Sequence, residues 1–255
     1  MISIYKKQSE TLKKCLKIEK VISIRFSNRK TFAFNKFRDT ACTALARSLR
    51  SDILTYIDRK SGQLCPGGNY FLNITHPSTK EICAVYVEDE KVFANDLICS
   101  NFIKKLPKYP AVAKKRYILF TPLVKENNKP DAVLFLANPA QTSRILGLSV
   151  YKGMSYPSVM PALPTCASLY ASIESNKIHI NFIDYFDRYY QGKQNGRSLW
   201  KDSNLIISMP FGIFEEIIKY IPMSAHGNYK PKIKPQKFDP IVNHRRAEHA
   251  VNTGK

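Results

Sequence analysis

Two stretches of the chain share one pattern of apolar and polar positions, and each contains a cysteine. In residues 40–49 and 164–173, apolar side chains follow the cysteine at the third and seventh positions, which is the spacing of one face of a helix. Apolar runs of β type flank both stretches, at residues 21–26 and 53–57 for the first and at residues 132–136 and 178–183 for the second. The pattern predicts a unit of strand, linker, cysteine-headed helix and strand that is used twice.

The remaining pattern predicts further helices and strands. It indicates helices over residues 4–16, 92–106, 138–151 and 211–220, and strands over residues 81–87, 116–124 and 204–208. Thr40 and Asn138 stand at predicted helix starts, where their side chains can accept a backbone N–H. Together these elements predict an α/β (or α+β) fold in which helices pack on a mixed sheet.

The predicted domain organisation is simple. We expect a single globular domain over residues 1–226, made of two related halves at about 18–106 and 115–222. Residues 227–255 form a basic tail that is rich in proline and lysine, and we expect this tail to be disordered.

Composition places the chain among soluble proteins. Hydrophobic residues make up 44% of its 255 residues, which is typical of a globular domain. Apolar runs stay well short of the ~20 residues that span a bilayer, so a membrane is not an expected partner. The first 20 residues are rich in lysine and lack the apolar core of a signal peptide, which predicts a cytoplasmic protein.

The net charge of +20 is the most unusual property of the composition. Such a charge attracts nucleic acids and small anions. The lysines are spread along the chain rather than clustered, which favours a solvated basic surface over a specific site. A single-stranded nucleic-acid binder remains a third hypothesis, because aromatic and basic residues alternate at Tyr189, Tyr190, Lys193, Arg197 and Trp200.

Six cysteines are scattered along the chain without a C-x-x-C pair. This spacing does not predict a disulfide scaffold or a zinc ribbon, so folding would have to assemble any metal site from distant ligands. Cys15, Cys83 and Cys99 lie in apolar runs, which is typical of cysteines that fill the core. Cys42, Cys65 and Cys166 lie in motifs instead, and they are the candidate ligands.

Cys65 opens the sequence Cys-Pro-Gly-Gly-Asn-Tyr. Gly67 and Gly68 free the backbone for a close approach to a ligand, and successive N–H groups there could form a nest for an anion. A plain turn explains the same residues equally simply.

Several short motifs occur in a distinctive order along the chain. They are Cys42 followed by alanines, Cys65 with Gly67 and Gly68, residues 130–135, residues 138–141, Cys166, Asp187-Arg188 and Met209-Pro210. Over roughly residues 10–222 this set resembles an uncharacterised family of archaea and bacteria, domain of unknown function 169. The resemblance implies a cytoplasmic prokaryotic protein with no agreed activity. The chain departs from the family at Phe186, where the family has a small residue before its Asp-Arg pair.

A cysteine at the N-terminus of a helix has a lowered pKa, because the helix dipole favours its thiolate. We expect this of Cys42 and Cys166. If the halves pack about a pseudo-twofold axis, Cys42, Cys65 and Cys166 share one pocket between them. Three thiolates suit a soft metal ion, an iron–sulfur cluster or haem iron, with Asp184 or Asp187 completing the ligand set. A small anionic ligand is the other occupant that we consider.

The alternative is an enzyme in which Cys166 or Cys42 attacks an electrophilic substrate. Arg188 would bind a carboxylate or a phosphate of that substrate, although a local ion pair with Asp187 explains the same residues. The sequence offers no obvious histidine base for such a reaction. The candidate ligand-binding residues are Gly67, Gly68, Asn138, Gln141, Asp187 and Arg188.

Overall fold

A computed structural model shows the mixed α/β fold that the sequence predicts. It describes residues 3–30, 33–36, 40–59, 65–75, 77–105, 115–151, 153, 158–160, 165–169, 171–184, 187–188, 193–194, 197–198 and 200–228. The predicted tail therefore lies almost wholly outside the described residues. No helix within these ranges is both long enough and apolar enough to cross a membrane.

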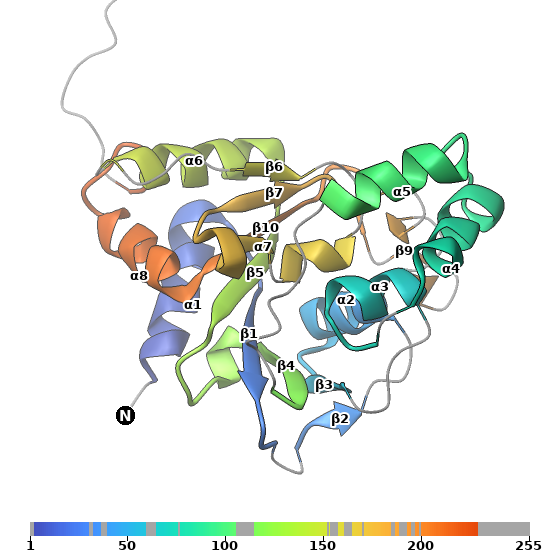
Figure 1. Cartoon of the computed structure of the whole chain (residues 1–255). Coiled ribbons are helices and arrows are strands. Elements are labelled where there is room, and N and C mark those ends of the chain that lie inside the picture. Colours follow the sequence, from blue (N-terminus) through green and yellow to red (C-terminus); the bar gives the residue numbers. More distant parts are fainter. Residues whose placement is uncertain are drawn as a thin grey trace, which may run out of the picture.

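Eight strands of the described chain form one sheet in the order β2-β3-β4-β1-β5-β10-β7-β6 (Figure 1). Their bounds are β1 Val21–Ser27, β2 Asn35–Lys36, β3 Thr55–Asp58, β4 Tyr117–Pro122, β5 Ala132–Ala137, β6 Ser158–Met160, β7 His179–Asn181 and β10 Leu205–Pro210. A separate ribbon joins β8 Lys193–Gln194 to β9 Arg197–Ser198. Pairing is parallel at the two edges of the large sheet and antiparallel between them, so the sheet is mixed.

The two edges of the sheet pair in the same way. From either edge, one parallel pairing is followed by antiparallel pairings up to the central pair of β1 and β5. The cysteine-bearing segments at 40–49 and 165–169 precede β3 and β7, which hold corresponding places beside the two edge strands. The internal repeat of two related halves stays a prediction, because strand order alone does not establish it.

Helices cover both faces of the sheet (Figure 1). The α-helices are α1 Ile4–Leu16, α2 Ala41–Ser51, α3 Pro66–Phe71, α4 Thr79–Cys83, α5 Asp96–Lys105, α6 Pro139–Val150, α7 Ala171–Ser175 and α8 Phe211–Tyr220. A π-helix, η1, spans Ala84–Asp89, and two 3-10 helices, η2 and η3, span Leu123–Lys125 and Thr165–Leu169.

Alternation along the central strands divides the core between the two faces. Ile22 and Ile24 of β1 pack in the cluster formed with α2 to α5, η3 and α7, whereas Val21 packs in the cluster formed with α1, α6 and α8. Successive side chains of a strand point to opposite faces, so a strand covered on both faces is apolar on both. The cluster with α2 also contains Cys166 and Trp200, and it surrounds the candidate site.

Two helix starts follow the predicted capping chemistry. The Thr40 side chain accepts a hydrogen bond from Thr43 N at 3.2 Å, and Asn138 accepts one from Gln141 N at 2.9 Å. These contacts are local in sequence, which is why the residue types predict them.

The predicted strand over residues 81–87 is wrong, because this segment forms α4 and then η1. Ser78 and Glu81 close a capping box at the start of α4, and this reciprocal pair favours a helix. The next helix begins at Asp96 rather than at Val92. Within this helix Leu97 and Ile98 are 70% and 49% exposed, and the buried residues are Cys99 and Ile103.

Two further expectations about the motifs need correction. The turn predicted at Cys65 is the start of helix α3, with Pro66 at its first position, where a missing N–H costs nothing. Cys166 does not head an α-helix, since it is the second residue of the 3-10 helix η3.

Candidate functional site

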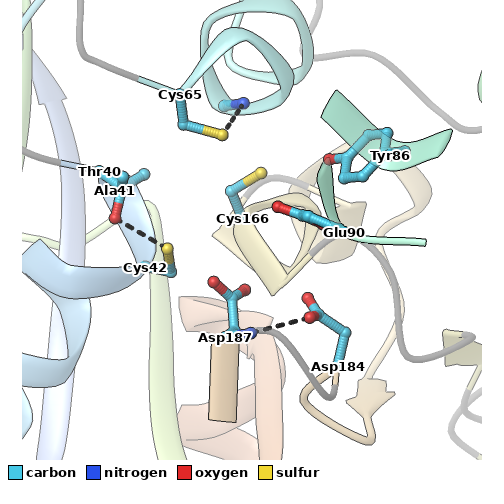
Figure 2. A pocket seen from close by; sticks show the side chains of 10 residues that line it. Thr40, Ala41, Cys42, Cys65, Tyr86, Glu90, Cys166, Asp184 and Asp187 are labelled. Carbon is cyan, nitrogen blue, oxygen red and sulfur yellow. Dashed lines mark hydrogen bonds between the residues drawn. The ribbon is translucent and has the colours of Figure 1, made fainter. Parts of the chain in front are cut away.

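Ten residues from separated parts of the chain surround one small cavity of about 30 Å³, which we call the thiol pocket (Figure 2). Its lining residues are Thr40, Ala41, Cys42, Cys65, Gly68, Tyr86, Glu90, Cys166, Asp184 and Asp187. The three candidate cysteines therefore lie around the same space, although they come from α2, from the start of α3 and from η3.

The start of α2 holds Cys42 through its cap. Thr40 Oγ1 lies 2.9 Å from Cys42 Sγ in a hydrogen bond, and the same oxygen accepts from Thr43 N. Cys42 is 7% exposed. Burial raises its thiol pKa well above the ordinary value, and the negative charge of Asp187 adds to this shift. The predicted lowering of the Cys42 pKa by the helix dipole is therefore wrong, because desolvation of the thiolate outweighs it.

The start of α3 places Cys65 opposite Cys42. Cys65 Sγ accepts a hydrogen bond from Gly68 N at 3.4 Å, which favours the thiolate, yet burial still raises its pKa to about 11. Gly67 has a steric role beside it, since a Cβ at Gly67 would lie 2.4 Å from the hydroxyl oxygen of Tyr86. The glycine thus gives Tyr86 room to line the cavity.

Tyr86 and Glu90 are site residues that sequence reasoning missed. They come from η1 and the residue after it, where Glu90 N donates to Val85 O at 2.9 Å in the five-residue spacing of a π-helix. Such one-turn π segments are frequent at functional sites. Burial and the charge of Asp187 raise the pKa of Glu90 to about 7. The capping box at Ser78 and Glu81 was the available sign that this segment is helical.

A pair of aspartates closes the other side of the cavity. Asp184 accepts hydrogen bonds from Asp187 N at 2.9 Å and from Thr165 Oγ1 at 3.3 Å. Burial and the negative charge of Asp187 raise the pKa of Asp184 to about 9, which favours the neutral form of its carboxyl group.

Burial and neighbouring negative charge also raise the pKa of Cys166 well above its ordinary value, with burial as the largest cause. None of the described lining residues is Lys, Arg or His. The thiol pocket is therefore lined by thiols and carboxyl groups, which become anions when they lose a proton, although the chain as a whole carries +20.

Arg188, next to Asp187, turns its guanidinium toward the backbone. It donates to Phe182 O at 3.1 Å, to Asn204 O at 3.2 Å and also to Lys201 O. It joins the end of β7 to the segment before β10 and is 9% exposed. These contacts give Arg188 a structural role in holding the loop that carries the two aspartates.

Asn138 and Gln141 lie elsewhere in the fold. Each side chain accepts from the backbone N–H of the other, and Gln141 Nε2 donates to Leu16 O and Lys17 O at 3.2 and 2.7 Å. They border another cavity, of about 370 Å³, whose lining includes three lysines and Glu19 and which is separate from the thiol pocket. The contacts of these two side chains fasten α1 to α6.

The aromatic residues proposed for nucleic-acid binding do not form a stacking surface that the structure describes. Trp200 is 3% exposed and packs in the core cluster with α2. Tyr189 and Tyr190 lie outside the described residues, as do the side chains of Lys193 and Arg197. Burial of an indole ring excludes stacking of a base on Trp200.

Metal coordination needs closer spacing than the side chains have. Among the described residues, no group of three or more His, Cys, Asp or Glu side chains is placed to hold a metal ion. Three of the cysteines nevertheless share one cavity with three carboxyl groups.

The fold and the site define a mixed α/β protein with a buried pocket of thiols and carboxyls. The pattern of domain of unknown function 169, described as "Uncharacterised ArCR", matches residues 11–220, so the chain belongs to this family. No curated protein and no solved structure matches the chain. The family match spans both predicted halves but assigns no activity.

Proposed function

We propose that the thiol pocket binds a single soft metal cation. The observation that carries the proposal is the gathering of Cys42, Cys65 and Cys166 with Asp184 and Asp187 around one cavity without a basic lining residue in the described chain. Thiolates are the preferred ligands of Zn²⁺, Cu⁺ and other soft ions, and carboxylates complete such ligand sets.

The size of the cavity narrows the choice of occupant. About 30 Å³ exceeds the ~10–15 Å³ that one water needs and is far below the ~300 Å³ of a pocket for an organic cofactor. A haem would not fit without rebuilding the surrounding elements, and a four-iron cluster is also larger than the space. A single ion fits best among the candidates that the sequence suggests.

The charge of the lining argues against an anion and for a cation. Asp187, Glu90 and the thiols would repel an anionic ligand as they ionise. Burial raises the pKa values of Cys65 and Asp184, which favours their protonated forms, and a metal ion would compete with the proton for the same lone pairs. Cation binding should therefore release protons and strengthen as the pH rises.

Binding also requires the ligands to move closer together. Cys65, Cys166 and Glu90 lie in or next to the short segments α3, η3 and η1, whereas Cys42 lies in the first turn of the longer helix α2. Rotation of the side chains and small shifts of these segments would close the ligands on an ion.

The experiment is titration of anaerobically purified, metal-stripped full-length protein with Zn²⁺ or Cd²⁺, followed by calorimetry in buffers of different ionisation enthalpy. We expect one ion per chain, release of protons and, with Cd²⁺, the ultraviolet absorption of thiolate bonds. Iron and zinc analysis of the protein as purified gives an independent reading.

Cys65→Ser removes one proposed ligand, and Cys15→Ser is the matched control because Cys15 is half-buried and lies outside the pocket lining. We expect Cys65→Ser to weaken binding more than about tenfold, the lower end of the effects seen when the surroundings of a metal are disturbed. Equal affinities in the two variants, or no binding by the unmodified chain, would contradict the proposal.

A thiol-dependent enzyme that uses Cys166 or Cys42 is less well supported. A nucleophilic cysteine needs a lowered pKa, whereas burial raises the pKa of both thiols. The described lining also includes no histidine that could serve as a base.

A further inference from the structure

We propose that a second, basic site binds the phosphate or diphosphate group of a small phosphorylated molecule. This basic hollow lies at the end of β1, beside the loop that joins β4 to β5, and has a volume of about 540 Å³. It is lined by Arg25, Ser27, Asn28, Arg29, Lys30 and Asn128. The proposal does not depend on the function of the thiol pocket.

The lining of the hollow is positively charged. Three of its six described lining residues are cations and none is acidic. The nearest ion-pair partner is the buried Glu126, whose Oε1 lies 3.9 Å from Arg25 Nε. Arg29 and Lys30 have no carboxylate within ion-pair distance in the described chain. At least two positive charges are thus left for a ligand.

The buried carboxylate beneath Arg25 is already satisfied. Glu126 accepts from Ser23 Oγ at 2.7 Å and from the backbone N–H groups of Asn127 and Asn128 at 3.0 Å. It is 2% exposed. Glu126 therefore anchors the loop that forms one wall, and it cannot reach out to neutralise the other cations of the hollow.

The opposite wall is also held in place before any ligand arrives. Arg29 N donates to Ser27 Oγ at 3.0 Å, and Asn28 Oδ1 accepts from Arg116 N at 3.1 Å. The Lys30 ammonium lies 4.8 Å from the centroid of the Tyr56 ring, in a cation–π contact. These contacts reduce the ordering that a ligand must impose, which lowers the entropic cost of binding.

The side chains match the chemistry of a phosphate. Arginine presents a planar fork of N–H donors that pairs with two phosphate oxygens, and lysine adds a compact charge. The carboxamides of Asn28 and Asn128 offer neutral donors beside them. The volume of about 540 Å³ falls within the ~300–1,000 Å³ typical of small-molecule pockets, which favours a small ligand over a polymer.

The test uses pyrophosphate as the probe and a 12-nucleotide single strand as the competing polymer, with the full-length protein at two salt concentrations. Arg29→Glu and Lys30→Glu reverse charges in the hollow. Lys14→Glu makes the same change on the exposed face of α1 and is the control for net charge. Calorimetry or equilibrium dialysis gives the affinity, and circular dichroism checks that each variant folds.

We expect pyrophosphate to bind the unmodified chain and Lys14→Glu with similar affinity, and to bind Arg29→Glu and Lys30→Glu about tenfold or more weakly, because charge-assisted hydrogen bonds are lost. If all three variants weakened pyrophosphate binding equally, net charge alone would explain the effect and the proposal would be overturned. Failure of the unmodified chain to bind pyrophosphate would also overturn it. If only the oligonucleotide binds and follows the same variants, the hollow serves a polymer, and the small-ligand assignment is wrong.

Discussion

The thiol pocket and the basic hollow lie in one chain and differ in every property that decides what a site can bind. The thiol pocket holds about 30 Å³ between buried thiols and carboxyls, whereas the hollow holds about 540 Å³ between cations that contact solvent. In the pocket, burial raises the pKa values of acidic groups, as it does for Asp184, whose pKa is about 9. In the hollow, fixed charges of arginine and lysine stay available.

The difference teaches that net charge says little about an individual site. The chain carries +20, yet its thiol pocket is lined by acids and thiols in the described structure. Local desolvation and neighbouring groups decide the charge of a buried site, while the excess of lysine decides the field outside. Substitutions at the two sites should separate the tightly packed surroundings of the pocket from the open surroundings of the hollow.

The largest expected effect comes from comparing two arginines. Arg188→Met should lower the free energy of unfolding by about 2–3 kcal/mol, because three backbone carbonyls lose a charged donor in a part-buried loop. Arg29→Met in the hollow should change it by less than about 0.5 kcal/mol, as is usual for a surface position. Urea denaturation measures both. Similar losses of unfolding free energy in the two variants would contradict the proposed difference between a structural Arg188 and a surface Arg29.

The next effect concerns the steric role of Gly67. Gly67→Ala should destabilise the fold by about 1–3 kcal/mol, since its Cβ would stand 2.4 Å from the Tyr86 hydroxyl oxygen. Gly212→Ala is the matched control in α8, because no heavy atom lies within 4 Å of the added carbon. Adding Tyr86→Phe to Gly67→Ala should recover part of the loss in thermal denaturation. An unchanged melting temperature for Gly67→Ala would show that the Tyr86 ring moves freely.

A further effect, which is a slope and not a single loss, should appear as a dependence on pH in the metal-free protein. The folded-state pKa of Asp184, about 9, lies above the ~3.9 of an unfolded aspartate, so the folded state holds the proton more tightly. The stabilising contribution is full below about pH 4 and is lost as the pH rises through about 9. Between these values the free energy of unfolding should fall, by at most about 1.4 kcal/mol per pH unit.

Asp184→Asn tests that slope, because asparagine keeps an oxygen that can accept from Asp187 N but does not ionise. We expect the variant to show a flatter profile in urea denaturation between about pH 5 and 9 and to gain stability relative to the unmodified chain as the pH rises. Parallel profiles would mean that Asp184 is not the group that holds the proton.

The smallest expected effect belongs to the hollow. Lys30→Ala removes the cation–π contact with Tyr56, at 4.8 Å, and should cost about 0.5 kcal/mol because the ammonium is exposed. The same variant should weaken pyrophosphate binding much more than it changes stability. A loss of stability as large as that of Arg188→Met would place Lys30 among structural residues instead.

Short-range chemistry was predictable from residue types. Thr40 and Asn138 cap helices whose starts the apolar spacing also indicates, and both cap contacts join residues three positions apart. The helices over residues 4–16 and 211–220 match α1 and α8, since an apolar stripe on one face is a property of the sequence itself. The motif cysteines likewise differ from the core cysteines in the residues that surround them along the chain.

The charge state and the complete lining of the site were not predictable. Cys42 does head a helix, yet its thiol pKa is raised rather than lowered, because the penalty of burial depends on everything packed around it. Tyr86 and Glu90 reach the cavity only through the π-helical register of η1, in a segment whose apolar residues also suit a strand. Arg188 is of a residue type that binds carboxylates and phosphates, but in the structure its guanidinium donates to backbone carbonyl groups.

The amino-acid sequence alone therefore determined the fold class, the principal helix starts, the family and the large excess of positive charge. Tertiary structure decided that three distant cysteines border one cavity, how small that cavity is, and that burial raises the pKa of Asp184 there. The reason is range. Helix caps and apolar periodicity act over a few residues, whereas desolvation and cavity volume depend on atoms contributed from the whole length of the folded chain.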